Sequence, residues 1–138
     1  MMNLSLQDRL VLNVRDSAIL TTSYVTANIL NPNDSAVLYN CSKFNGYNLY
    51  VDFTKGSLTT AEIKIEFSED GTNWYQESNN LISGGTNTVT VNENVLSTTG
   101  AYMIKGTCDN KYIRISSKGT GTVTSSSLAI KIALLNRN

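Results

Sequence analysis

The stretch AEIKIEFSEDGTNWYQE, residues 61–77, alternates apolar and charged residues and then reaches a turn signal. Successive side chains of a strand point to opposite sides. One face therefore holds Ala61, Ile63, Ile65 and Phe67, and the other holds Glu62, Lys64 and Glu66. The dipeptide Asp70-Gly71 favours a tight reversal, because Gly accepts positive φ and Asp tolerates a left-handed backbone. The stretch predicts a hairpin with Phe67 buried beside Ile63 and Ile65, and with Trp74 packed across the turn.

The same period of two recurs through most of the chain. Alternating runs occupy residues 47–54, 87–92, 100–107, 112–118 and 127–136, with a short strand at 74–76 and a polar loop at 78–85. Short strands separated by Gly, Asn and Ser loops are typical of a β-sandwich or jelly roll. We therefore expect an all-β fold: a single, jelly-roll-like sandwich of about eight strands between residues 35 and 136, with no helix after Pro32.

The last run, SLAIKIALLN, is apolar on both faces. Leu128, Ile130, Ile132 and Leu134 share one face, and Ala129, Ala133 and Leu135 share the other around Lys131. Either a central strand or a strand covered by another subunit has this composition.

Residues 1–31 precede the sandwich domain, which is expected at 32–138, and Pro32 in NPND separates the two. The segment is an N-terminal arm that docks on a neighbouring copy, or it adds a strand to its own sheet; its content of Thr, Val, Ile and Tyr favours an extended backbone. If it is an arm, the candidate interface residues are Ile19, Leu20, Tyr24, Val25, Ile29 and Leu30.

Composition narrows the function classes. The 138 residues suit one domain, and eleven basic side chains balance eleven acidic ones, which argues against nucleic acid or an anionic membrane as a partner. Histidine is absent, and with it the commonest designs for acid–base catalysis and transition-metal binding.

With no secretory signal and no apolar run long enough to span a membrane, a soluble cytosolic product is expected. Cys41 and Cys108 lack metal-site spacing, and buried thiols are favoured over a disulfide.

Two site hypotheses concern the acidic residues near the turn. Glu66, Glu69, Asp70 and Glu77 could form a glycosidase-like carboxylate pair. However, outward charges ordinarily keep a sheet soluble, and no nucleophile elbow, P-loop or zinc motif is present. Asn73 and the neighbouring carboxylates offer oxygens to calcium, but the spacing is not that of an EF-hand. We expect no enzyme, no catalytic residue, no cofactor and no metal.

A carbohydrate-binding module is the alternative binding function. Such modules stack a sugar on an exposed aromatic side chain and bind its hydroxyls with Asn or Asp. The candidate surface aromatics are Tyr50, Trp74 and Tyr75, next to the Asn79-Asn80 loop.

The passage from Tyr47 to Glu77 resembles a segment of small β-sandwich virion proteins of tailed bacteriophages. The matching residues are Leu49, Val51, Thr54, Lys55, Gly56, Ile63, Lys64, Ile65, Glu66, Phe67, Ser68, Asp70, Gly71, Trp74 and Tyr75. The preceding SAILTTSYVTANIL, residues 17–30, resembles the extended N-terminal arm of such proteins.

The resemblance implies a structural protein of a bacteriophage virion, made in the host cytoplasm. The expected function is that of a head decoration or auxiliary capsid protein that binds capsid subunits, with a tail or head-tail connector component as an alternative. A homo-oligomer is expected, with a trimer favoured by analogy with phage decoration and fibre proteins. A host glycan is a possible additional ligand, whereas nucleic acid and membrane are not expected partners.

Overall fold

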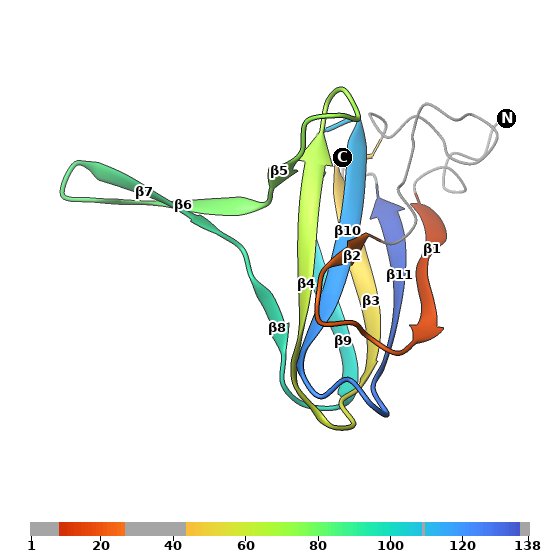
Figure 1. Cartoon of the computed structure of the whole chain (residues 1–138). Coiled ribbons are helices and arrows are strands. Elements are labelled where there is room, and N and C mark those ends of the chain that lie inside the picture. The colour runs from red at the N-terminus through yellow and green to blue at the C-terminus, as the bar shows by residue number, and fades with distance from the viewer. Residues whose placement is uncertain (1–8, 27–43, 109, 136–138) are drawn as a thin grey trace, which may run out of the picture.

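The computed structural model describes residues 9–26, 44–108 and 110–135. Over these residues the chain is all-β, as predicted, with eleven strands joined by turns and no helix (Figure 1). None of the described segments is a helix that could cross a membrane.

One antiparallel sheet contains four strands in the order β1-β11-β3-β9. Their bounds are Arg9–Ala18, Ser127–Leu135, Gly46–Thr54 and Gly100–Thr107. β11 pairs with β1 on one side and β3 on the other. β11 is therefore a central strand, one of the two expected alternatives, and Ala133 and Leu135 of its second face are also buried.

The second sheet has the order β2-β10-β4-β5, with β8 pairing with another part of β4. These strands are Val25–Thr26, Tyr112–Gly121, Leu58–Ser68, Tyr75–Gln76 and Asn94–Leu96. Ile63, Ile65 and Phe67 of β4 lie opposite Ser117, Ile115 and Ile113 of β10. A shift of one residue would turn the apolar set outward, so the burial of this face specifies the register.

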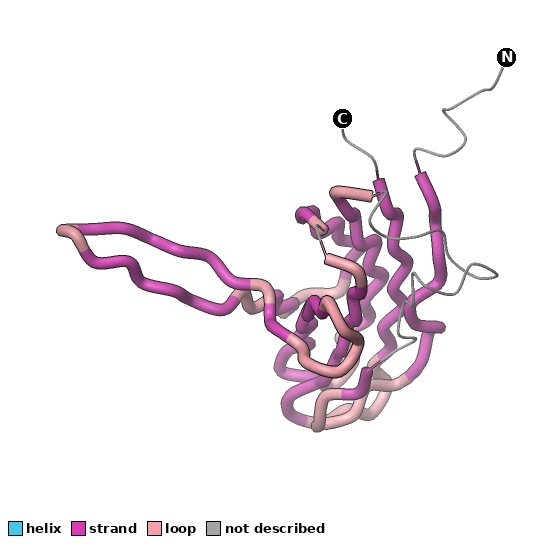
Figure 2. Tube along the Cα trace, turned by 90° about the horizontal axis from the view of Figure 1, so that it is seen from above, coloured by secondary structure: helices cyan, strands magenta, loops and turns pink. Residues whose placement is uncertain are grey.

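The two sheets enclose one core, an arrangement consistent with a β-sandwich (Figures 1 and 2). The following inward side chains are at most 1% exposed: Leu49, Val51, Ile63, Ile65, Ile113, Ile115, Leu128, Ile130, Ile132 and Leu134. These are the inward faces that the alternating pattern predicts. Phe67 is partly buried and packs against the same cluster.

The N-terminal segment joins both sheets of its own chain. After β1 the backbone crosses from the first sheet to β2 in the second, and Leu20 at the crossing is 1% exposed. The backbone N–H of Leu20 donates to Ser126 Oγ at 3.2 Å. Arg15 donates to the carbonyls of Ala18, Ile19 and Leu128 at the same crossing. Residues 9–18 and 25–26 therefore add strands to the sheets of their own chain, which is the second of the two alternatives for this segment.

The candidate arm residues thus separate into three groups. Leu20 is part of the core, whereas Ile19, Tyr24 and Val25 are exposed. Ile29, Leu30, Pro32 and Cys41 lie outside the described residues.

A third, two-stranded sheet is formed by β6, Ser78–Ser83, and β7, Thr86–Val91. It projects from the sandwich between β5 and β8 (Figures 1 and 2). The prediction of a polar loop at 78–85 is therefore wrong. The predicted strand at 87–92 is found at Thr86–Val91, and the short strand β8 was not predicted.

Candidate functional site

The projecting hairpin, residues 78–91, is the most exposed ordered element described. All six residues of β6 and all six of β7 are exposed. Gly84 and Gly85 form its turn with φ of +58° and +80°, the left-handed pair that a two-residue type I′ hairpin needs. The signal was present in the sequence, because a Gly-Gly pair separates two runs of strand-forming length. The Ser and Asn residues of SNNLIS instead favoured the prediction of a polar loop.

The hairpin has two unequal faces. Directly paired residues of an antiparallel ladder lie on one side, and β7 pairs with β6 as Val91↔Ser78, Val89↔Asn80 and Asn87↔Ile82. One side, called here the apolar face, thus carries Ile82, Val89 and Val91 with Ser78, Asn80 and Asn87. The opposite side carries Leu81 among Asn79, Ser83, Thr86, Thr88 and Thr90.

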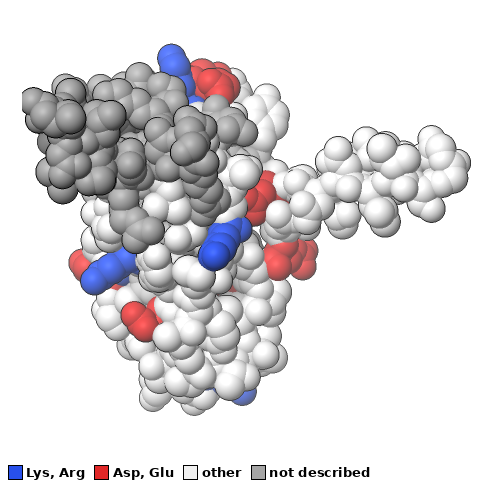
Figure 3. Space-filling model, turned by 180° about the vertical axis from the view of Figure 1, so that it is seen from behind, with Lys and Arg blue, Asp and Glu red and all other residues white. Residues whose placement is uncertain are grey.

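Ile82, Val89 and Val91 are 73%, 64% and 48% exposed. Between Glu77 and Glu93 the sequence has no charged residue. Acidic and basic side chains appear on the body of the molecule, whereas the hairpin carries neither (Figure 3). Proteins usually protect exposed strand edges with charges, proline or bulges. A two-stranded projection that has no charge, lacks these devices and exposes Ile82, Val89 and Val91 on one face is suited to contact another surface.

The base of the hairpin is held to the sandwich by Glu77. Its Oε2 accepts a 2.6 Å hydrogen bond from the hydroxyl of Tyr47, which is fully buried, and its Oε1 accepts one of 3.0 Å from Asn92 Nδ2. The backbone N–H of Asn92 donates to the Glu77 carbonyl at 2.8 Å, which joins the two feet of the hairpin. Burial, and then the Glu77 carboxylate, raise the pKa of Tyr47 well above its usual range. The tyrosine therefore remains a neutral donor, and the hairpin has an anchored base.

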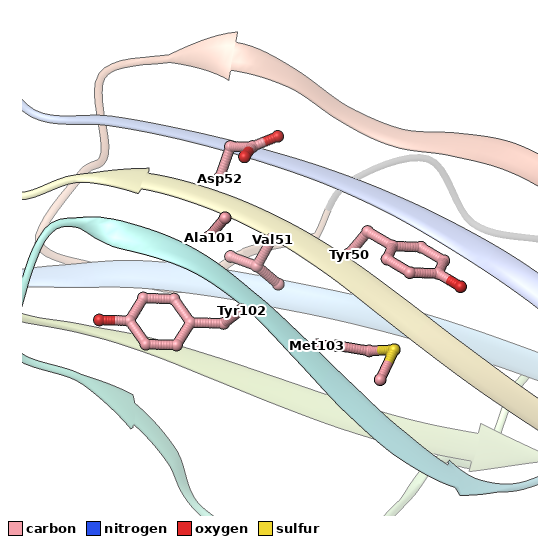
Figure 4. A pocket seen from close by; sticks show the side chains of 6 residues that line it. All are labelled: Tyr50, Val51, Asp52, Ala101, Tyr102 and Met103. Carbon is pink, nitrogen blue, oxygen red and sulfur yellow. The ribbon is translucent and has the colours of Figure 1, made fainter.

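A second exposed feature lies on the outer face of the first sheet. Tyr50 and Asp52 of β3 pair with Met103 and Ala101 of β9. Because Ala101 is small, an open depression of about 280 Å³ lies among these side chains (Figure 4). Tyr50 is 37% and Met103 50% exposed. The depression can receive one or two side chains of a partner.

The three candidate surface aromatics are not in equivalent positions. Trp74 was expected to pack across the turn against the strand of Ile63 and Phe67, but it is not among the side chains packed on the core. It lies half-buried with the Arg114 guanidinium 4.3 Å from its ring centre. Arg114 Nε also donates to Glu66 Oε1 at 3.0 Å, and Glu66 is only 8% exposed. Tyr75 is 71% exposed on β5, and Tyr50 lies on the other sheet.

The carboxylate oxygens of Asp70 accept hydrogen bonds from residues of their own turn. Asp70 Oδ1 accepts from the N–H groups of Thr72 and Asn73 and from Ser68 Oγ, and its Oδ2 accepts from Asn73 Nδ2, at 2.7–3.0 Å. These bonds, first those from the Asn73 and Thr72 backbone, hold the pKa of Asp70 well below its usual range. The Asp-Gly turn is confirmed, with Gly71 at φ +76°. Within the described ranges no three His, Cys, Asp or Glu side chains gather to hold a metal ion.

No protein-family model matches the chain, and no curated protein matches it.

Proposed function

We propose that this chain is a structural protein of a bacteriophage virion, most specifically a head decoration or auxiliary capsid protein. The observation that carries the proposal is the anchored, uncharged hairpin at 78–91, whose exposed apolar face suits a contact with other virion subunits. A tail or head-tail connector component would use the same hairpin in the same way. We further propose that the protein forms a homo-oligomer, with a trimer favoured.

The order of strand pairing supports a jelly roll, the fold proposed for such a subunit. β1 pairs with β11, β2 with β10, β3 with β9, and β4 with both β5 and β8. In the pairs β1–β11, β2–β10, β3–β9 and β4–β8, early strands pair with late ones in order, as in one long antiparallel ribbon wound around a core. The projecting hairpin lies at the closed end of this ribbon, between β5 and β8.

The contacts of the acidic residues favour binding over catalysis. Glu66 is paired with Arg114, Asp70 accepts from its own turn, and Glu77 accepts from Tyr47 and Asn92. Each carboxylate thus has a structural task. We propose accordingly that the protein is not an enzyme.

Mass spectrometry of purified particles tests the proposal. We expect the wild-type protein in the particles, and its loss when Asn80–Val89 is replaced by a Gly-Gly turn. The matched control is Thr88→Ser, a small change on the opposite face of the hairpin, which should keep incorporation. Particles that lack the wild-type protein would overturn the proposal.

Carbohydrate binding is the second candidate, because Tyr75 is 71% exposed at the edge of the second sheet. It predicts that Tyr75→Ala abolishes binding on a glycan array and that the fold survives. A wild-type protein that binds no glycan on the array would remove this candidate.

A further inference from the structure

We infer that the apolar face of the hairpin docks on a second copy of this chain, in the depression bounded by Tyr50, Ala101 and Met103. The inference rests on the proposed function in treating the hairpin as an assembly contact. It goes further by naming the occupant and the receiving surface.

The two surfaces match in chemistry. Ile82, near the tip of the hairpin, is 73% exposed, and the depression of about 280 Å³ has an aromatic ring and a thioether on its walls. Both are apolar at the centre. Burying an aliphatic side chain in such a site removes its apolar surface from water, which favours binding.

The surroundings of the two surfaces also match. Asn80 and Asn87 lie beside the apolar side chains of the hairpin. Asp52 of β3 is exposed and lines the depression, and Lys105, also exposed, lies two positions after Met103 on β9. Amide groups can donate to a carboxylate and accept from an ammonium, so neither charge meets a like charge. An apolar centre with a polar rim is the usual anatomy of a protein interface.

The hairpin cannot fulfil this role within its own chain. It extends away from the sandwich in both views (Figures 1 and 2). Glu77 and Asn92 fix its base through Tyr47 and the backbone pair. The receiving surface must therefore belong to another molecule.

The contact area favours a second copy over an unrelated protein. A standard interface buries about 800 Å² on each partner over about 20–30 residues, or about 30–40 Å² per residue. The fourteen residues of the hairpin then supply about 500 Å², too little for a stable complex by itself. In a closed ring each copy both gives its hairpin and receives another, so it buries about 1,000 Å². A copy leaves a closed ring only when both of its contacts break, so ring closure supplies the stability that one contact of this area lacks.

Sedimentation equilibrium of the full-length protein tests the occupant. We expect the wild type to form a closed oligomer. Val89→Lys should raise the dissociation constant at least about tenfold, and Thr90→Lys should change it by less than about threefold. The control adds the same charge to the same strand on the other face. The inference would be overturned if the wild type were monomeric at about 100 μM, because its dissociation constant would then be higher than that concentration. It would also be overturned if the two lysine substitutions raised the dissociation constant equally.

A photo-crosslinking amino acid in place of Ile82 tests the receiving surface. We expect crosslinks between copies to peptides from β3 or β9, and their loss in Ala101→Arg. Crosslinks confined to hairpin peptides would overturn the assigned surface. The particle experiment separates the two proposals. A protein that is monomeric but is still found in particles would refute self-docking alone. A protein that is oligomeric but is absent from particles would refute the virion role alone.

Discussion

Trp74 shows how one aromatic side chain can follow a turn without entering the core. It lies two positions before Gln76, which pairs with Glu66, so both side chains point to the outer face of the second sheet. There its ring covers the guanidinium of Arg114, and Arg114 in turn holds Glu66. The ring shields an ion pair from water rather than covering apolar side chains.

Removing this ring tests the arrangement. We expect Trp74→Ala to lower the free energy of unfolding by about 1–2 kcal/mol, which combines a cation–π contact with partial apolar burial. Tyr75→Ala, at a neighbouring and mostly exposed position, should change it by less than about 0.5 kcal/mol. Urea titration measures both. A loss of more than about 3 kcal/mol for Trp74→Ala would indicate a core role.

Asp70 makes stability depend on acid pH. Hydrogen bonds hold its folded pKa below the unfolded value of about 3.9. Its stabilising contribution is therefore fully present above about pH 4 and is lost as the pH falls toward the folded pKa. We expect the stability advantage of wild type over Asp70→Asn to shrink below about pH 4. Unfolding curves between pH 2 and 7 measure this, and a constant difference would contradict it.

At the scale of elements, the hairpin is attached to the sandwich at its base rather than along its length. β6 and β7 pair with each other and project from the core, whereas Glu77 reaches a buried tyrosine of the opposite sheet. Glu77 thus links the projecting element to both sheets, through its carboxylate to Tyr47 and through its backbone N–H, which donates to the carbonyl of Ile65 at 2.9 Å.

Glu77→Ala removes the acceptor of two hydrogen bonds. We expect the free energy of unfolding to fall by about 1.5–3 kcal/mol, because bonds to charged groups are the stronger ones. Amide exchange at residues 77 and 92 should also accelerate. Glu93→Ala, at the other foot of the hairpin and exposed, is the control and should have an effect below about 0.5 kcal/mol. Equal effects of the two alanines would argue against an anchored base.

The N-terminal crossing belongs to the same scale. Leu20 is 1% and Ile19 58% exposed, although they are adjacent in sequence. We expect Leu20→Ala to cost about 2–5 kcal/mol and Ile19→Ala less than about 1 kcal/mol. Thermal and chemical unfolding of the two variants decide the point. If both were neutral, this segment would not be part of its own sandwich.

At the scale of the whole molecule, the proposed assembly joins a hairpin without charged residues to a depression centred on Tyr50 and Met103, in a chain with no net charge. Screening by salt weakens contacts between exposed charges but leaves apolar contacts in place. We expect the dissociation constant of the oligomer to change by less than about threefold between 0.05 and 1 M NaCl. Sedimentation measures it, and a tenfold weakening at high salt would show that ion pairs drive assembly.

The sequence by itself determined the fold class, the inward faces and the Asp-Gly turn. These depend on local information. A period of two separates Ile63 and Ile65 from Glu62 and Lys64 wherever the strand lies, and Gly71 accepts its φ of +76° whatever surrounds it. The two apolar faces of the last strand left two alternatives open, and its central position in the order β1-β11-β3-β9 came from the structure.

Only the tertiary structure decided which elements meet. Trp74 contacts Arg114 on β10, forty positions along the chain. Leu20 is buried and Ile19 exposed because the backbone changes sheets between β1 and β2. The depression beside Ala101 likewise exists because β3 and β9 are adjacent. Pairings between distant segments depend on the geometry of the whole chain, and no local pattern of residues encodes that geometry.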